Sequence, residues 1–260
     1  MSKSTKKIFK TAALSAALLL TPFINQKPLL ERKQKEALYY SRQELSYITE
    51  PVLFFYEGHG EAFYSIEASK AIPIIKKYGF DLLFLECLDE HEGKVKAAHK
   101  AFAENKADES DERIDKLRKL LENNYVMGTA DAYLRLIKAA AESQMEVACI
   151  DVKLDVANKN GKLMFKDEKE AVDTTQRILF SRELHMLDKV MEEIKKGRKV
   201  AIFIGFLHAT SDYGGAVVKY FLNEKEYKKY IEHPTIKKML LDKGISVAIY
   251  SYQNNETNPN

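Results

Sequence analysis

Five short apolar runs divide the chain, and each is nearly continuous in hydrophobic character. They are residues 51–56 (PVLFFY), 81–86 (DLLFLE), 146–151 (EVACID), 199–205 (KVAIFIG) and 245–250 (ISVAIY). A strand that is covered on both faces has this pattern, because neither of its sides needs to be polar. The pattern therefore predicts about five strands in a sheet that is buried on both faces.

Segments with helical periodicity or composition separate these runs. They are residues 61–77, where Pro73 is expected to kink or end the helix, 90–144 with two or three helices, 171–196 with Gly197 at its end, and 212–222. Within the second segment, residues 130–141 have the clearest helical period, whereas residues 154–168 have none and are expected to form a loop or small hairpin. The alternation predicts an α/β domain with a mainly parallel central sheet flanked by helices and a helical insertion after the second strand.

The first 25 residues differ from the rest of the chain. A lysine-rich start precedes the apolar stretch AALSAALLL, which is typical of a secretory signal and short for a membrane-spanning helix. We expect export to the periplasm, the cell exterior or a membrane-anchored state, with membrane contact only through this segment if it is uncleaved. An amphipathic extension on a cytosolic protein is the alternative. Residues 26–50 are expected to form a linker and a short helix, 51–252 the α/β domain, and 253–260 a disordered tail.

Composition narrows the function only slightly. The formal net charge is +3, from 41 basic and 38 acidic residues, and this balance predicts no nucleic-acid partner. The two cysteines, Cys87 and Cys149, lie in apolar runs, and we interpret them as buried small hydrophobic residues in preference to a disulfide. The chain lacks the standard zincin, phosphate-loop and serine-hydrolase motifs, which makes those classes less favoured.

Ionisable residues follow four of the predicted strands. Glu57 and His59 follow the first strand, Glu86 ends the second, Asp151 ends the third, and His208 follows the fourth. Ligands of open α/β sheets bind at the carboxyl ends of the strands, so these residues are expected to share one site. Each residue alone is also compatible with an ordinary polar turn or a structural hydrogen bond.

Two of these positions suggest a specific chemistry. Glu57 and His59 lie two residues apart, and a carboxylate beside an imidazole can raise the basicity of the ring for a general base or a metal ligand. A turn with two exposed polar side chains is the alternative. Arg182 shares a helix face with Ile178 and Met186, so it either extends to solvent or binds a buried carboxylate or an anionic substrate.

The remaining polar residues near these positions are less informative. Glu183 and His185 follow Arg182, but the sequence does not show which way their side chains face. We predict that His91, His99 and His233 are surface residues because their surroundings are rich in charge.

The order of these motifs resembles a known superfamily. It contains erythromycin esterase-like proteins, ChaN-like haem-binding proteins, and the TraB and Tiki proteins. The matching features are Tyr56-Glu57-Gly58-His59, where the family has Gly-Glu-x-His, then Glu86, Arg182 with Met186 in SRELHM, and Gly205 with His208 in Gly-x-x-His. The resemblance runs from about residue 51 to 250, and Tyr56 departs from the family's glycine.

The resemblance implies two kinds of function. The first is a hydrolase of a small molecule or peptide, in which His59 activates water directly or through a divalent metal such as Mn, Co or Zn. Glu57, Glu86, Arg182 and His208 would complete this site, and His59, Glu86 and His208 would hold the metal. The second is haem binding without catalysis. Tyr56, His59 or His208 would then ligate the iron, and Phe63 and Tyr64 would cover the ring. An inactive scaffold that binds partners is a third alternative.

Overall fold

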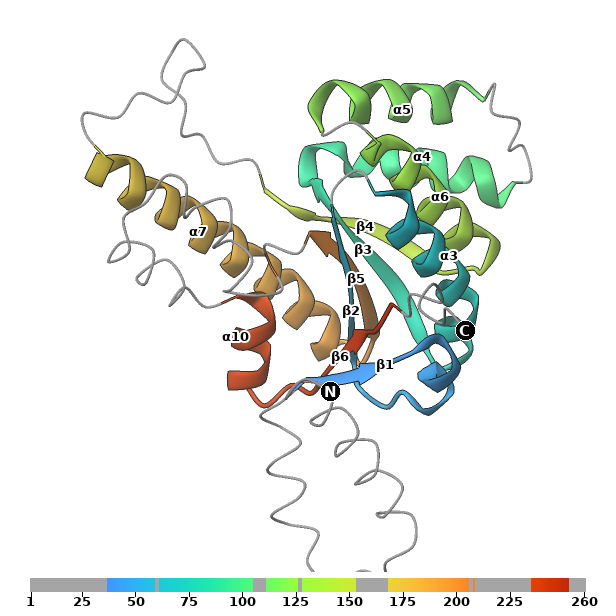
Figure 1. The fold of residues 1–260 in the computed structure, drawn as a ribbon. Coiled ribbons are helices and arrows are strands. Elements are labelled where there is room, and N and C mark those ends of the chain that lie inside the picture. Colours follow the sequence, from blue (N-terminus) through green and yellow to red (C-terminus); the bar gives the residue numbers. More distant parts are fainter. Residues whose placement is uncertain are drawn as a thin grey trace, which may run out of the picture.

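One parallel sheet organises the described part of the chain (Figure 1). The computed structural model describes residues 37–58, 61–104, 111–125, 128–152, 168–205, 208 and 235–252, with side chains of the helix at 168–195 described from residue 180 onward. The strands are β1 (Leu38–Tyr40), β2 (Val52–Glu57), β3 (Phe80–Leu88), β4 (Glu146–Asp151), β5 (Lys199–Gly205) and β6 (Val247–Tyr250). They lie in the order β1-β6-β2-β5-β3-β4, and every pairing between them is parallel. Their carboxyl ends therefore share one end of the sheet, called here the carboxyl edge.

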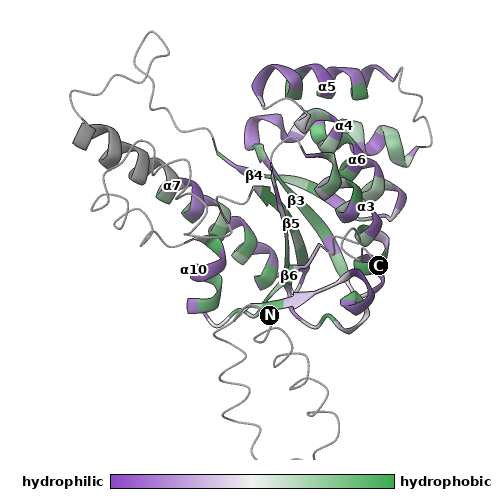
Figure 2. Cartoon of the chain, in the orientation of Figure 1, coloured by the Kyte–Doolittle hydropathy of each residue, from purple (hydrophilic) through white to green (hydrophobic). Residues whose placement is uncertain are grey.

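Helices cover both faces of this sheet. α3 (Ala62–Lys77), α4 (Glu92–Ala103), α5 (Glu112–Asn124) and α6 (Thr129–Glu142) lie on one side, and α7 (Glu168–Lys195) and α10 (Ile236–Asp242) lie on the other (Figure 1). Two 3₁₀ helices, η1 (Arg42–Tyr47) and η2 (Asp89–His91), follow β1 and β3. Figure 2 shows apolar strands between helices with mixed faces, as a double-sided α/β sheet requires. The predicted α/β class, with a mainly parallel sheet flanked by helices, is confirmed.

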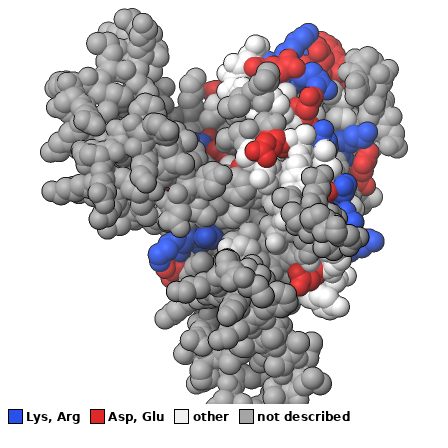
Figure 3. All heavy atoms as spheres, viewed as in Figure 1, with Lys and Arg blue, Asp and Glu red and all other residues white. Residues whose placement is uncertain are grey.

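The core consists of two apolar clusters, one on each face of the sheet. Alternate residues of a strand point to opposite faces, so Phe55 packs in the cluster under α3 and α6, whereas Phe54 packs in the cluster under α7 and α10. Met186 and Val190 are the fully buried residues by which α7 joins the second cluster. Figure 3 shows described acidic and basic side chains interspersed over the visible surface.

The five predicted strands are present, and the sequence interpretation missed a sixth. β1 lies within the segment that was expected to be linker and short helix, and it pairs with β6 through Leu38 and Tyr40. Its three residues are too few to show a periodicity, and it is a strand because the edge of β6 is available to it. The expected short helix is the 3₁₀ helix η1.

The helix predictions can be compared in the same way. α3 does not end at Pro73, which lies inside it on the exposed side, because buried Ile72 and Ile75 hold both flanks of the proline to the core. Three helices, α4 to α6, occupy the segment between β3 and β4. Gly197 has a φ of +77°, which glycine adopts readily, and it follows the end of α7 as predicted.

The predicted loop at 154–168 falls almost wholly outside the described residues, and the predicted helix at 212–222 does so entirely. None of the described helices has the length and apolarity of a membrane span.

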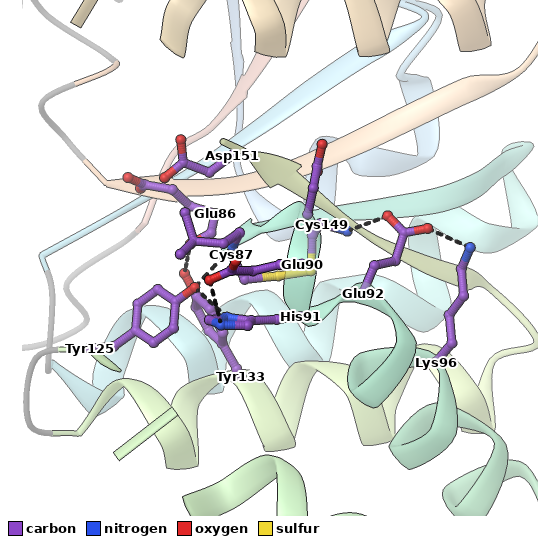
Figure 4. The surroundings of a disulfide bond; sticks show 12 residues. Glu86, Cys87, Glu90, His91, Glu92, Lys96, Tyr125, Tyr133, Cys149 and Asp151 are labelled. Carbon is purple, nitrogen blue, oxygen red and sulfur yellow. Dashed lines mark hydrogen bonds and ion pairs between the residues drawn. A yellow bond between two sulfur atoms is a disulfide. The ribbon is translucent and has the colours of Figure 1, made fainter. Parts of the chain in front are cut away.

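A disulfide joins Cys87 of β3 to Cys149 of β4, so our interpretation of the cysteines as separate small hydrophobic residues was wrong (Figure 4). Both side chains are fully buried on the α3 side of the sheet, and their Cα atoms lie 4.9 Å apart. The order of strands in a sheet cannot be obtained from two isolated apolar runs, and only that order makes these cysteines neighbours.

The side chains of Glu92 and Lys189 bind the backbone of Cys149 along the outer edge of β4. The N–H of Cys149 donates to Glu92 Oε2 over 3.4 Å, and its carbonyl accepts a 2.9 Å hydrogen bond from Lys189 Nζ. Because β4 is an edge strand, these groups would otherwise be available to pair with another chain. The contacts therefore protect the edge beside the disulfide.

The disulfide should contribute strongly to stability. Its cysteines are 62 residues apart, and closing a loop of this length restricts the unfolded chain by an amount equivalent to about 4 kcal/mol. We expect the double variant Cys87→Ala/Cys149→Ala to lose roughly 2–4 kcal/mol of unfolding free energy in urea titrations. A loss below about 1 kcal/mol would show that the cross-link has little effect on the unfolded state.

Candidate functional site

Arg182 of α7 binds two carboxylates at the carboxyl edge. Its Nε donates to Asp151 Oδ1 over 2.8 Å, and its Nη2 donates to Asp151 Oδ2 over 2.6 Å and to Glu86 Oε1 over 3.1 Å. The planar guanidinium matches the two oxygens of Asp151, an arrangement that a lysine could not reproduce. Arg182 therefore ties α7 to the ends of β3 and β4.

His208 lies between two other carboxylate contacts. Its Nδ1 is 2.5 Å from Glu183 Oε1, and its Nε2 is 3.0 Å from Glu86 Oε1. The second oxygen of Glu86 accepts the Gly205 N–H over 2.7 Å, and the second oxygen of Glu183 accepts the Ile236 N–H over 2.5 Å. With an acceptor at each ring nitrogen, the doubly protonated imidazolium is the form that satisfies both contacts. We call Glu86, Asp151, Arg182, Glu183 and His208 the charge cluster.

The electrostatics of the cluster favour its ionised state. Burial opposes ionisation of Glu86, but the His208 charge and hydrogen bond, the Arg182 charge and the Gly205 N–H together lower its pKa to about 2. Burial likewise opposes the charged form of His208, but Glu86 and Glu183 raise its pKa to about 10. The pKa of Arg182 also lies above its ordinary value, since Asp151 and Glu86 outweigh its burial. Each charge in the cluster thus depends on the others.

Arg182 is the most accessible member of the cluster. Its side chain is 24% exposed, whereas the side chains of the other four members are all buried. A molecule that reaches this edge of the sheet can therefore contact the guanidinium before any other charge of the cluster.

Glu57 lies beside the cluster but on the other face of the sheet. It is buried at the end of β2, opposite Gly205, the residue whose N–H binds Glu86. Burial is the main cause of the raised pKa values of Tyr133 and Tyr252, and the Glu57 charge adds to both. Tyr133 also donates a 2.7 Å hydrogen bond to the Glu86 carbonyl, so the two faces are connected through β3.

The structure brings together four of the predicted site residues, namely Glu86, Asp151, Arg182 and His208, and places Glu57 next to them. His59 lies outside the described residues. Glu183 was not predicted as a site residue, although a signal for it exists. Met186, Leu187 and Val190 are buried three, four and seven positions after it, which is the spacing of one helix face.

The residues proposed for metal and haem binding fit these groups poorly where they are described. Both ring nitrogens of His208 are occupied by carboxylates, and among the described residues no group of three His, Cys, Asp or Glu could hold a metal ion. The Tyr56 ring is buried and stacked on Phe54, and burial raises its pKa well above the usual value. Burial therefore opposes formation of the tyrosinate that would ligate haem iron.

Two of the histidines that we predicted to be on the surface are not. His91 is buried, with its Nδ1 3.1 Å from the Tyr125 hydroxyl, and His99 is partly buried, with its Nε2 2.8 Å from the Met145 carbonyl. The lysines around them, Lys94, Lys96 and Lys100, are exposed, so the charge-rich sequence gave no sign of these inward contacts. His233 lies outside the described residues.

Two further α7 side chains, His185 and Lys189, lie on the same side of the helix as Arg182. His185 Nε2 is 2.9 Å from Asp89 Oδ2, and Lys189 forms an ion pair with the other oxygen of Asp89. The spacing of Arg182, His185 and Lys189 places them along one stripe of the helix. This stripe docks on acidic residues within and just after the carboxyl ends of β3 and β4.

The comparisons with known proteins give only distant structural similarities. No family model and no curated protein sequence matches the chain. Among solved structures, the type III effector HopBA1 is 13% identical, with a TM-score of 0.44 over 63% of this chain and 69% of its own. ChaN of Campylobacter jejuni, described with cofacial haem binding, is 12% identical, with a TM-score of 0.43 over 90% of this chain and 88% of its own.

Stability should depend on pH through Glu86 and His208. The raised pKa of His208 gives a contribution that is complete below its ordinary value of 6.5 and is lost as pH rises through about 10. The lowered pKa of Glu86 gives a contribution that is present above its ordinary value of 4.5 and is lost as pH falls through about 2. The network is therefore at full strength between these two ordinary values.

Urea unfolding of the protein and of His208→Gln at about pH 5.5 and about pH 9.5 tests this dependence. We expect the unmodified protein to lose at least about 1.4 kcal/mol more than the variant over this interval, which corresponds to one pKa unit. Parallel pH profiles for the two proteins would contradict the assignment of a raised pKa to His208.

Proposed function

We propose that this chain is a hydrolase of a small-molecule or peptide substrate, with its site at the carboxyl edge of the sheet. The main support for the proposal is the Arg182 guanidinium, which two carboxylates hold in place and which is still partly exposed. A fixed cation at the exposed end of the buried charge cluster is suited to stabilise negative charge that develops on a carbonyl oxygen.

The cluster itself supplies position and charge to this reaction. His208, as an imidazolium between Glu183 and Glu86, is not a base, and its function is to keep Glu86 ionised and Arg182 oriented. His59 would take the proton from water, the resulting hydroxide would attack the carbonyl carbon, and Arg182 would face the oxyanion. Collapse of that intermediate would break the ester or amide bond, and protonated His59 would return its proton to the departing alcohol or amine. Glu57, two residues before His59, would orient the ring.

A metal-dependent form of this reaction has less support. Binding of Mn, Co or Zn by His59, Glu86 and His208 would require an unprotonated nitrogen on His208, and the contacts to Glu86 and Glu183 favour protonation of both nitrogens. We therefore propose direct activation of water by His59.

Haem binding is the second candidate function, and one observation favours it. Phe63, at the start of α3, is 38% exposed, and its ring centroid lies 5.5 Å from that of Tyr64. Such an aromatic surface beside the turn after β2 would suit a flat apolar ligand. Because Tyr56 and His208 are poorly suited to ligate iron, His59 would have to supply the axial ligand.

We propose that the protein is exported. The lysine-rich and apolar start of the sequence supports this proposal, and so does the disulfide, since such bonds persist in oxidising compartments and are rare in the cytosol.

The hydrolase proposal predicts a specific pattern among variants. In a screen of ester and peptide substrates, His59→Ala should reduce turnover by at least about 100-fold, while the unfolding midpoint stays within a few degrees. Arg182→Lys should lower kcat more than it raises KM, because the oxyanion exists only in the transition state. Ile66→Ala, at an exposed position of the helix that follows the same turn, serves as the control for general damage. Full turnover by His59→Ala would contradict the assignment of His59 as the general base.

A thermal-shift series separates the two candidate functions. Haemin, Mn, Co, Zn and EDTA are each added to the protein, since a ligand that binds only the folded state raises the unfolding midpoint. We expect no metal to raise the midpoint in a manner that His208→Gln removes. A rise with haemin that is absent in His59→Ala would replace the hydrolase by a haem-binding protein.

A further inference from the structure

The disulfide joins the two strands that carry the carboxylates bound to Arg182. Glu86 directly precedes Cys87 on β3, and Asp151 comes two residues after Cys149 on β4. Figure 4 shows both carboxylates close to the cross-link, at the ends of the two strands. The covalent bond therefore lies at the place where the two strands must hold their acidic residues at a fixed spacing.

The pairing of β3 with β4 is irregular at this place. Leu85 pairs with Cys149, but the next partners are Leu88 and Asp151, so Glu86 and Cys87 together lie opposite a single residue of β4. A bulge of this kind interrupts the ladder hydrogen bonds and leaves the local spacing of the strands less determined. β4 is the edge strand, and within the described part of the chain no further strand restrains its outer side.

The side-chain contacts near the disulfide hold the two strands through helical segments. The Tyr133 hydroxyl binds the Glu86 carbonyl and the Tyr125 hydroxyl accepts the Leu88 N–H, which fastens β3 to the α5–α6 side. Lys189 of α7 binds both the Cys149 carbonyl and Asp89, so it links β4 to the residue that follows β3 through a helix. These contacts act through helical segments, whereas the disulfide joins one strand directly to the other.

We propose that the Cys87–Cys149 disulfide is a positioning device that lets Glu86 and Asp151 bind Arg182 together, so that the site is assembled only in the oxidised protein. The proposal concerns the assembly of the charge cluster and does not require the hydrolase or the haem function. It makes Cys87 and Cys149 positioning residues for that cluster.

The chemistry of the switch is thiol–disulfide exchange. A thiolate of an external dithiol attacks one sulfur of the cross-link and forms a mixed disulfide, and its second thiol then displaces the remaining protein thiolate. Two electrons and two protons pass to Cys87 and Cys149, and the dithiol leaves as a disulfide. A disulfide oxidant reverses the reaction. Both cysteines are fully buried, so reduction requires local opening of the structure around the carboxyl ends of β3 and β4.

The test follows the Arg182 Nε–H, which donates to Asp151, by nuclear magnetic resonance of ¹⁵N-labelled protein. The signal is assigned by its loss in Arg182→Lys. We expect its hydrogen exchange to be at least about tenfold faster in Cys87→Ala/Cys149→Ala than in the unmodified protein. The matched control is Leu117→Ala, which opens a cavity at a buried position of α5, a helix that packs on α4 and α6, and should cost comparable stability. Exchange in this control should stay within about threefold of the unmodified protein.

Retained protection of the Arg182 Nε–H in the double alanine variant would overturn the proposal and leave the disulfide with a stabilising role alone. Equal acceleration in the double variant and in Leu117→Ala would also overturn it, because general destabilisation would explain both. If the double variant does not fold, the same signal is followed in the unmodified protein before and after reduction with a phosphine, which keeps both sulfur atoms in place. Since no substrate or ligand is present, a failure of the hydrolase assignment leaves this result unaffected.

Discussion

The carboxylate of Glu86 is the contact on which the rest of the site depends. Its Oε1 atom faces both Arg182 and His208, and its Oε2 atom accepts the Gly205 N–H. A buried carboxylate loses much hydration energy, and only a complete set of donors makes its charged form tolerable. Those donors come from α7, from the end of β5 and from the segment after it. One ionised side chain therefore determines how three parts of the chain meet.

The same contacts also arrange the helices on this face. Glu183 accepts hydrogen bonds from His208 and from the N–H of Ile236, the first residue of α10. The apolar stripe of α7, with Met186 and Val190, fixes the helix against the sheet, and its polar stripe fixes the helix along the carboxyl edge. Site and fold are thus coupled, because removal of one charge leaves another buried without its partner. Loss of activity in a variant of Glu86 or Arg182 has meaning only beside a measurement of its stability.

The sequence predicted the parts of this structure that depend on local pattern. Continuous apolar runs identified five strands, and the helix that carries Arg182 followed from its period and from Gly197. The order of the strands is a tertiary property, and it alone makes Cys87 and Cys149 neighbours and exposes a β6 edge for β1. The partners of a charged residue are equally non-local. Asp151 and Glu86 lie 31 and 96 positions before Arg182, and no local rule connects them.

Under the proposed hydrolase function, the position of Glu57 gives the two faces of the sheet different roles. The charge cluster satisfies its own members and presents only Arg182, so it is suited to receive negative charge and not to start a reaction. A group that starts a reaction must have a free proton acceptor, and the doubly bound His208 has none in its charged state. Glu57 points to the opposite face, at the end of the strand that leads into His59. The arrangement therefore separates a fixed electrostatic half, assembled by Glu86, from a basic half that the turn after β2 would supply.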